Sequence, residues 1–169
     1  MKKILLLFIT TAFISCETKI TEVNKLGGMT YYGENTGKKF EIGSEESLKI
    51  AVSLVNAYAE GDFDLMNEMT TDTVFFFEPS FGKPIPVVNP ANEFLSQIQS
   101  PYDSITRRIW NAIPLKRADS DYETVTVSFI ENRYKKGEVE KLRIVDRIFI
   151  RDSKVFKKLF FNDQAISVL

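Results

Sequence analysis

Carboxylate side chains are the main candidates for acid-base chemistry in this chain, because its 169 residues contain no histidine. This absence excludes Ser-His-Asp and Cys-His catalysis, as well as the common zinc sites that use histidine. Any general acid or base must therefore be an aspartate, glutamate, tyrosine or lysine. The sequence also lacks a glycine-rich phosphate loop, a dinucleotide fingerprint and a Gly-x-Ser-x-Gly motif. We expect neither a cofactor nor a metal site.

Glu78 is the first candidate, because it follows three phenylalanines and precedes Pro79 in the stretch TVFFFEPSFGKP at residues 73–84. A carboxyl group held in an apolar pocket has a raised pKa, which suits a general base that works near neutral pH. The alternative is structural: Glu78 then ends a strand at the surface and remains in water.

Asp146 is the second candidate, because it interrupts apolar residues at every second position of an expected strand. These apolar neighbours are Leu142, Ile144, Ile148 and Ile150. An isolated carboxylate on a buried face is costly, so Asp146 must be paired, protonated or beside a wet pocket. A structural role predicts an ion pair with Lys157 or Arg107. A functional role predicts an acid that donates a hydrogen bond to a ligand.

Two helices and a strand are expected to lead to Glu78. Ser44 precedes two acidic residues and a run of apolar residues at helical spacing that stops at Gly61, which predicts an amphipathic helix capped at both ends. Asp62 is expected to cap a second, short helix. A strand should follow from Thr73 to Glu78, since this segment is rich in residues that fit a pleated surface.

The segment after Glu78 is expected to break this strand and then form a third helix. Pro79, Gly82, Pro84 and Pro86 are the expected breakers. Asn89 and Pro90 then resemble an N-cap followed by the first position of a helix, which should end near residue 99.

The C-terminal half predicts an antiparallel meander of strands at residues 104–115, 123–134, 139–151 and 154–161. A turn at residues 136–137 sets the first register so that the apolar faces coincide. The expected pairs are Val125 with Ile148, Val127 with Asp146, Phe129 with Ile144, and Glu131 with Leu142. A turn at residues 152–153 would then place Leu159 opposite Asp146 and Lys157 opposite Ile148.

This order of elements, with AYAEGDFDLMNEMTTDTVFFFEP at residues 57–79, resembles the nuclear transport factor 2-like superfamily, which includes SnoaL-like cyclases, ketosteroid isomerases and scytalone dehydratase. The resemblance covers roughly residues 44–169. It implies an α+β fold in which a curved antiparallel sheet wraps around N-terminal helices to form a cone with a pocket. Glu78 matches the place before a proline where the isomerases carry their general base. Their oxyanion-binding tyrosine corresponds to Leu54 here, and the histidine bases of other members are absent.

Such a cone implies a pocket whose lining we expect to be Tyr58, Phe76, Trp110, Val127, Phe129 and Leu159. Tyr58 and Trp110 have the alternative of packing in the core. The preferred function is binding of a small apolar ligand or a partner segment without catalysis. The first alternative is an isomerase or dehydratase with Glu78 as base and Asp146 as hydrogen-bond donor. The second is a homodimer across the outer sheet face, through residues such as Arg143, Val145, Arg147 and Phe149.

The N-terminus resembles that of a bacterial lipoprotein. Two lysines precede an apolar stretch too short to span a membrane, and Phe13-Ile14-Ser15-Cys16 is similar to a lipobox. We therefore expect a signal peptide at 1–15, lipid on Cys16, a tether over 16–43 and the domain at 44–169, held at the cell envelope. The alternative is an ordinary secretory signal. Within the tether, residues 29–32 and 39–42 are expected to pair as a hairpin. The net charge of −1 gives no reason to expect nucleic acid as a partner.

Overall fold

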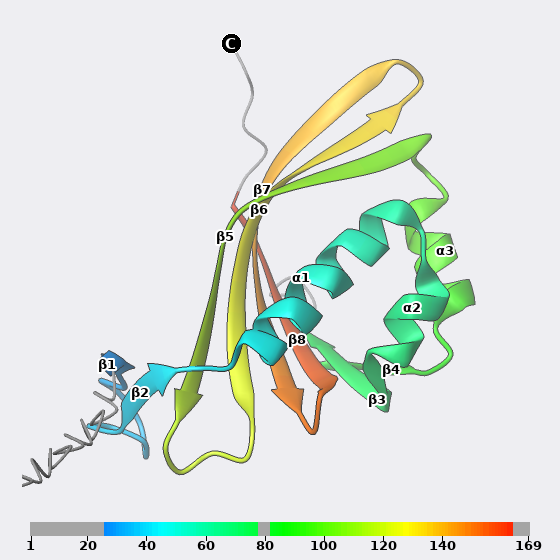
Figure 1. Cartoon of the computed structure of the whole chain (residues 1–169). Coiled ribbons are helices and arrows are strands. Elements are labelled where there is room, and N and C mark those ends of the chain that lie inside the picture. The colour runs from blue at the N-terminus through cyan, green and yellow to red at the C-terminus, as the bar shows by residue number, and fades with distance from the viewer. Residues whose placement is uncertain (1–25, 78–81, 164–169) are drawn as a thin grey trace, which may run out of the picture.

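The computed structural model describes residues 26–77 and 82–163, which form three helices and one curved sheet. The helices are α1 (Glu45–Glu60), α2 (Phe63–Glu68) and α3 (Asn92–Gln99). The strands are β1 (Leu26–Met29), β2 (Lys39–Ile42), β3 (Thr70–Phe77), β4 (Ile85–Val88), β5 (Ser104–Arg117), β6 (Glu123–Lys135), β7 (Glu138–Arg151) and β8 (Lys154–Asp163). Their order in the sheet is β1-β2-β5-β6-β7-β8-β3-β4. Figure 1 shows the long strands β5 to β8 curving around α1, with α2 and α3 at the end near β3 and β4.

The helix boundaries follow the expected capping residues. The Ser44 hydroxyl accepts a hydrogen bond from the Ser47 amide at 3.1 Å, and Gly61 ends α1 with a left-handed φ of 72°. The Asp62 carboxylate accepts a bond from the Leu65 amide at 3.0 Å and so begins α2. The prediction of two capped helices joined at residues 61–62 is confirmed.

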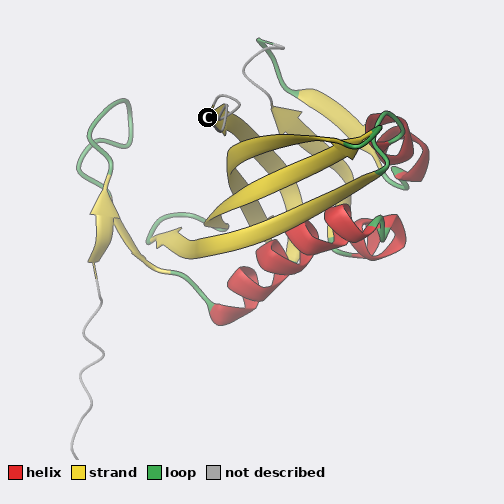
Figure 2. Ribbon diagram, turned by 90° about the horizontal axis from the view of Figure 1, so that it is seen from above, coloured by secondary structure: helices red, strands yellow, loops and turns green. Residues whose placement is uncertain are grey.

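The core lies between α1 and the inner face of the meander. Ala51, Leu54 and Val55 of α1 pack against buried residues of β6 and β7. The predicted register between these strands is confirmed in all four pairs, from Val125 with Ile148 to Glu131 with Leu142. Figure 2 shows the helices gathered along one side of the sheet, which leaves the other face of the meander uncovered by any described helix.

The predicted register between β7 and β8 is wrong beyond the first pairs. Ile150 pairs with Val155 but Phe149 pairs with Lys157, so Phe156 is an extra residue in a β-bulge. A one-residue shift moves every later side chain of β8 to the opposite face. As a result, Lys158 and not Lys157 lies opposite Ile148, and Leu159 lies opposite Arg147 instead of Asp146.

An aromatic cluster accompanies this bulge. The ring of Phe156 lies 5.7 Å from that of Tyr122 and 6.3 Å from that of Phe149, centroid to centroid. Rings at these separations attract one another. The extra residue is therefore accommodated by packing its side chain against two other aromatic rings.

The segment after β3 also differs from the prediction. Residues 85–88, expected only to break the preceding strand, form β4 and pair with β3. Pro86 is compatible with this because β4 lies at the edge of the sheet, where one side of the strand needs no ladder bonds. Strand β3 pairs in parallel with β8, so the sheet is mixed, with a single parallel pair among the described strands.

Helix α3 begins at Asn92, later than expected, with Ala91 at the N-cap position. The side chain of Asn89 is engaged elsewhere, because its Nδ2 donates to the carbonyl of Asn67 at 2.8 Å and to the hydroxyl of Thr70 at 3.2 Å. The peptide bond between Asn89 and Pro90 is cis. Asn89 therefore joins the α3 segment to the start of β3 instead of capping α3.

The N-terminal hairpin exists with a different first strand. Residues 26–29, and not 29–32, pair with residues 39–42. Strand β2 also pairs with β5, with Phe40 opposite Arg117, so this part of the expected tether extends the sheet. Within residues 26–77 and 82–163, no helix is both long and apolar enough to cross a membrane.

Candidate ligand-binding site

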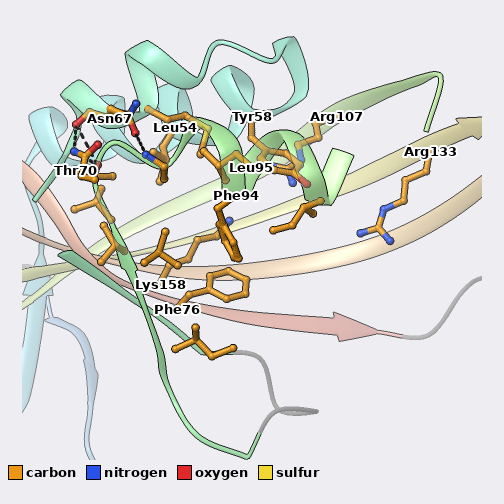
Figure 3. Close-up of a pocket in the computed structure, with 18 residues that line it drawn as sticks. Leu54, Tyr58, Asn67, Thr70, Phe76, Phe94, Leu95, Arg107, Arg133 and Lys158 are labelled. Atoms are coloured by element: carbon orange, nitrogen blue, oxygen red, sulfur yellow. Dashed lines mark hydrogen bonds between the residues drawn. The ribbon is translucent and has the colours of Figure 1, made fainter. Parts of the chain in front are cut away.

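A cavity of about 450 Å³ lies between the helices and the β3–β4 end of the sheet (Figure 3). Apolar side chains make up 11 of its 18 described lining residues, which gives it a mainly hydrophobic wall. The apolar wall includes Leu54 of α1, Met66 of α2, Phe94 and Leu95 of α3, and Val74 and Phe76 of β3. The volume and the lining are typical of small-molecule pockets.

The periodicity of the elements explains how these residues reach the same space. Leu54 and Tyr58 are four residues apart on α1 and therefore lie on one face of the helix. Val74 and Phe76 alternate on β3, as do Ile85 and Val87 on the paired strand β4, so each pair projects to one side.

Two arginines share one buried glutamate beside the cavity. The Nε of Arg107 donates to Glu131 Oε2 at 2.7 Å, and the Nε of Arg133 donates to Glu131 Oε1 at 2.6 Å. Glu131 is fully buried, and burial acts to raise its pKa. The two guanidinium groups outweigh that effect and lower the pKa below its ordinary value of 4.5. Arg107 and Arg133 line the cavity, and Glu131 lies behind them.

Tyr58 and Arg107 form a stacked contact at this end of the cavity. The guanidinium carbon of Arg107 lies 4.1 Å from the ring centroid of Tyr58 and 4.7 Å from that of Phe129. Its Nη1 also donates to the Val55 carbonyl at 3.1 Å. Burial raises the pKa of Tyr58 above 10.0, against the opposing influence of Arg107, so the phenol is neutral at physiological pH.

A second ionic contact lies in the floor of the cavity. Lys158 lines the cavity, and its Nζ is 2.9 Å from Oδ2 of the fully buried Asp146. Neither oxygen of Asp146 makes a well-directed hydrogen bond with a described residue. The contact is therefore an ion pair, defined by the short distance between the two charged groups. Asp146 is not among the described lining residues, whereas its partner Lys158 is.

The predicted partners of Asp146 are wrong, although an ion pair is present. Lys157 projects from the outer face, where its Nζ lies 5.0 Å from the ring centroid of Phe149. Arg107 is bound to Glu131 instead. The bulge in β8 explains the first error, because it turns Lys158 inward in place of Lys157.

The other predicted site residues are divided between cavity, core and surface. Tyr58 and Phe76 line the cavity. Val127 and Phe129 are fully buried in the core and are not among the described lining residues. Both follow the inward alternation of β6, but the helices cover this part of the strand.

Trp110 and Leu159 were expected at the cavity and lie elsewhere. Trp110 is the extra residue where the β5–β6 register shifts between Ile109 and Asn111, and it is 50% exposed. Leu159 shares the outer face with Arg147 because of the bulge in β8. Glu78 and Cys16 are outside the described residues, so the predictions for them stay predictions.

Sequence reasoning missed Arg133, Lys158 and the polar group that joins α2 to α3. In that group, Asn67 Oδ1 accepts from the Ala91 amide at 3.0 Å, close to the contacts of Asn89 described above. The signal for Arg133 was available, because it continues the inward alternation of Phe129 and Glu131 on β6.

Among the described residues, no group of three or more His, Cys, Asp or Glu side chains could hold a metal ion.

Several solved structures have a chain that follows a similar course. AusH from Aspergillus nidulans has a TM-score of 0.56 at 17% identity, covering 73% of this chain and 88% of its own. An LEH-like epoxide hydrolase from M. tuberculosis has a TM-score of 0.55 at 13% identity, covering 70% and 83%. A putative ketosteroid isomerase from Kribbella flavida has a TM-score of 0.52 at 14% identity, covering 76% and 85%. The chain has the nuclear transport factor 2-like fold.

No protein-family model and no curated protein matches the sequence of this nuclear transport factor 2-like chain. The structural likeness at such low identity establishes the fold, and the fold hosts many unrelated functions. A function for this chain must therefore be argued from the residues of the cavity.

Proposed function

We propose that this nuclear transport factor 2-like domain binds a small, largely apolar molecule in its cone cavity and does not convert it. The observation that carries the proposal is the cavity itself, about 450 Å³ in volume and lined mainly by apolar side chains. Pockets for small molecules typically range from about 300 to 1,000 Å³ and combine an apolar wall with a few polar groups. The polar groups here include Asn67, Arg133 and Lys158, and the apolar part contains Phe94 (Figure 3).

The position of Asp146 supports binding without turnover. An isomerase-like role would need a carboxyl group that reaches the ligand, whereas both carboxylate oxygens of Asp146 are buried and one is paired with Lys158. Leu54 occupies the position expected for the oxyanion-binding tyrosine and contributes only an apolar surface. Both features favour a binding protein over the isomerase alternative.

The domain is further proposed to be tethered to a membrane through lipid on Cys16. In Figure 1, β1 and β2 lie at the opposite end of the sheet from α2 and α3, which border the cavity. A chain held from its N-terminal side would therefore leave the cavity end open to the surrounding water. This arrangement suits a domain that takes up a ligand at the cell envelope.

The binding proposal can be tested by titrating the purified protein with Nile red, an uncharged dye whose fluorescence increases in apolar surroundings. We expect saturable binding at one site. Ile98→Trp should weaken it by at least about tenfold, because Ile98 lines the cavity and a larger side chain would fill it. Gln97→Trp is the matched control, since Gln97 is exposed on the same helix and does not line the cavity. Absence of saturable binding, or equal effects of the two variants, would contradict the proposal.

A further inference from the structure

We infer that the cavity selects amphipathic anions, which are molecules with an apolar body and one carboxylate-like group, and that Arg133 holds this group. The inference rests on the proposed binding function and adds the chemical class of the ligand. It begins from the charges around the cavity. Its described lining includes Arg107, Arg133 and Lys158 but no aspartate or glutamate.

The carboxylates that balance these cations lie behind the wall and are too few. Asp146 matches Lys158, so that pair is close to neutral. Glu131 is shared by Arg107 and Arg133, so the buried group of three carries a net positive charge. Glu140 also contacts Arg133, 3.7 Å from its Nη1, but it is about half exposed and screened by water. Within the group of Arg107, Arg133 and Glu131, a positive charge therefore remains that only a water-screened carboxylate opposes.

Arg133 is the cation best placed to use this charge on a ligand. Arg107 is only 4% exposed, and its Nε and both terminal nitrogens contact Glu131 or the Val55 carbonyl. Arg133 is 23% exposed. Its Nε donates a hydrogen bond to Glu131, and its Nη1 donates one to the Tyr102 hydroxyl at 3.3 Å. No hydrogen bond from Nη2 to a described residue is found. Figure 3 shows the guanidinium of Arg133 directed from β6 toward the cavity.

The chemistry of guanidinium favours a carboxylate over neutral or cationic groups. A planar guanidinium matches a carboxylate through charge-assisted hydrogen bonds, which are about twice as strong as neutral ones. An alcohol of the same chain length offers a single neutral oxygen, so it satisfies fewer of these donors and its hydrogen bond is not assisted by charge. A protonated amine would be repelled by the positive charge of the group formed by Arg107, Arg133 and Glu131. The expected order of affinity is carboxylate first, alcohol second and amine last.

The test compares decanoate, decan-1-ol and decylamine as competitors of Nile red on the purified protein near neutral pH. The three molecules share one apolar chain, so differences in affinity report the head group. We expect decanoate to bind about tenfold more tightly than decanol, as one charged hydrogen-bonding group would give, and decylamine to bind most weakly. Equal binding of decanoate and decanol, or tighter binding of decylamine, would overturn the inference and leave the proposed function intact. Failure of every ligand and of Nile red would instead overturn the proposed function.

Two variants assign the effect to Arg133. Arg133→Gln should abolish the preference for decanoate over decanol while decanol still binds, and decanol binding also shows that the variant is folded. Glu140→Gln removes a partly exposed competing carboxylate, so decanoate affinity should rise by up to about fivefold without a change for decanol. If Arg133→Gln does not fold, Glu140→Gln still decides the assignment. An unchanged preference in either variant would overturn the role of Arg133.

Discussion

Lys158 lies opposite Ile148 and places its Nζ 2.9 Å from Asp146 Oδ2, because β8 accommodates Phe156 as one extra residue. Without the bulge, Lys157 would occupy the inward position and Lys158 would face outward. The bulge therefore decides which lysine neutralises the buried carboxylate. It also decides which lysine borders the cavity.

This relationship predicts opposite outcomes for two adjacent lysines. Lys158→Gln should lower the free energy of unfolding by about 3 to 5 kcal/mol, because it leaves the carboxylate of Asp146 buried without a partner. Lys157→Gln should cost less than about 1 kcal/mol, since that side chain faces outward over Phe149. Urea unfolding of both variants, followed by circular dichroism, measures the difference.

The double variant Asp146→Asn with Lys158→Gln serves as the control for this pair. It removes both charges, so it should be more stable than Lys158→Gln alone. Equal destabilisation by the two single lysine variants would show that the assigned register of β8 is wrong.

A second prediction tests which face of β6 is buried. Val127→Ala should lower the free energy of unfolding by about 1 to 3 kcal/mol, since Val127 is fully buried in the core. Thr126→Ala, at the adjacent and partly exposed position, should lower the free energy of unfolding by less than half as much. The measurement is the shift of the denaturant midpoint at unchanged slope. Equal shifts would contradict the assigned facing.

The elements that sequence predicted well are those specified by local rules. The caps at Ser44, Gly61 and Asp62 follow from residue type and position. The β6–β7 register follows from apolar alternation across a two-residue turn, in which Gly137 has a φ of 83°. These signals depend on neighbouring residues alone, so they can be read without knowledge of the tertiary structure.

The elements that sequence missed depend on contacts between distant segments. The β8 bulge relies on Phe156 packing against Tyr122, more than thirty residues away in the chain. Strand β4 tolerates Pro86 because it lies at a sheet edge, and an edge position is a property of the whole sheet. Lys158 reaches the cavity through the same β8 bulge, whereas the inward position of Arg133 follows from the alternation of β6 and could have been predicted.

A third prediction concerns the proposed lipid anchor. Cys16→Ser should release the protein from membranes, because the lipid would be attached to the sulfur of the single cysteine in the sequence. Cells that express either form are fractionated, and the membrane pellet is washed with high salt. If the variant remains in the washed pellet to the same extent as the unchanged protein, the anchor proposal is wrong.

The final prediction uses the shared glutamate between Arg107 and Arg133. Burial acts to raise the pKa of Glu131, but the two arginines lower it below 4.5 in the folded protein. A folded-state pKa below the unfolded one means that ionised Glu131 stabilises the fold at neutral pH. This stabilisation is lost as the pH falls through the folded-state pKa. Glu131→Gln should therefore be most destabilising near neutral pH, by about 3 to 5 kcal/mol, because it leaves two guanidinium groups unbalanced beside the core.

The destabilisation should diminish as the pH is lowered below about 4.5, where the unfolded glutamate takes up a proton. Denaturant unfolding of the unchanged protein and of Glu131→Gln, measured between about pH 3 and pH 7, gives the difference in free energy at each pH. Taking differences cancels the titration of the other carboxylates, which both proteins share. Glu140→Gln is the matched control, since it alters a half-exposed partner of the same Arg133 and should show a small effect across this range. A penalty for Glu131→Gln that stays constant with pH would mean that the charge of Glu131 does not stabilise the fold, and the ionic group would then have no part in positioning Arg133.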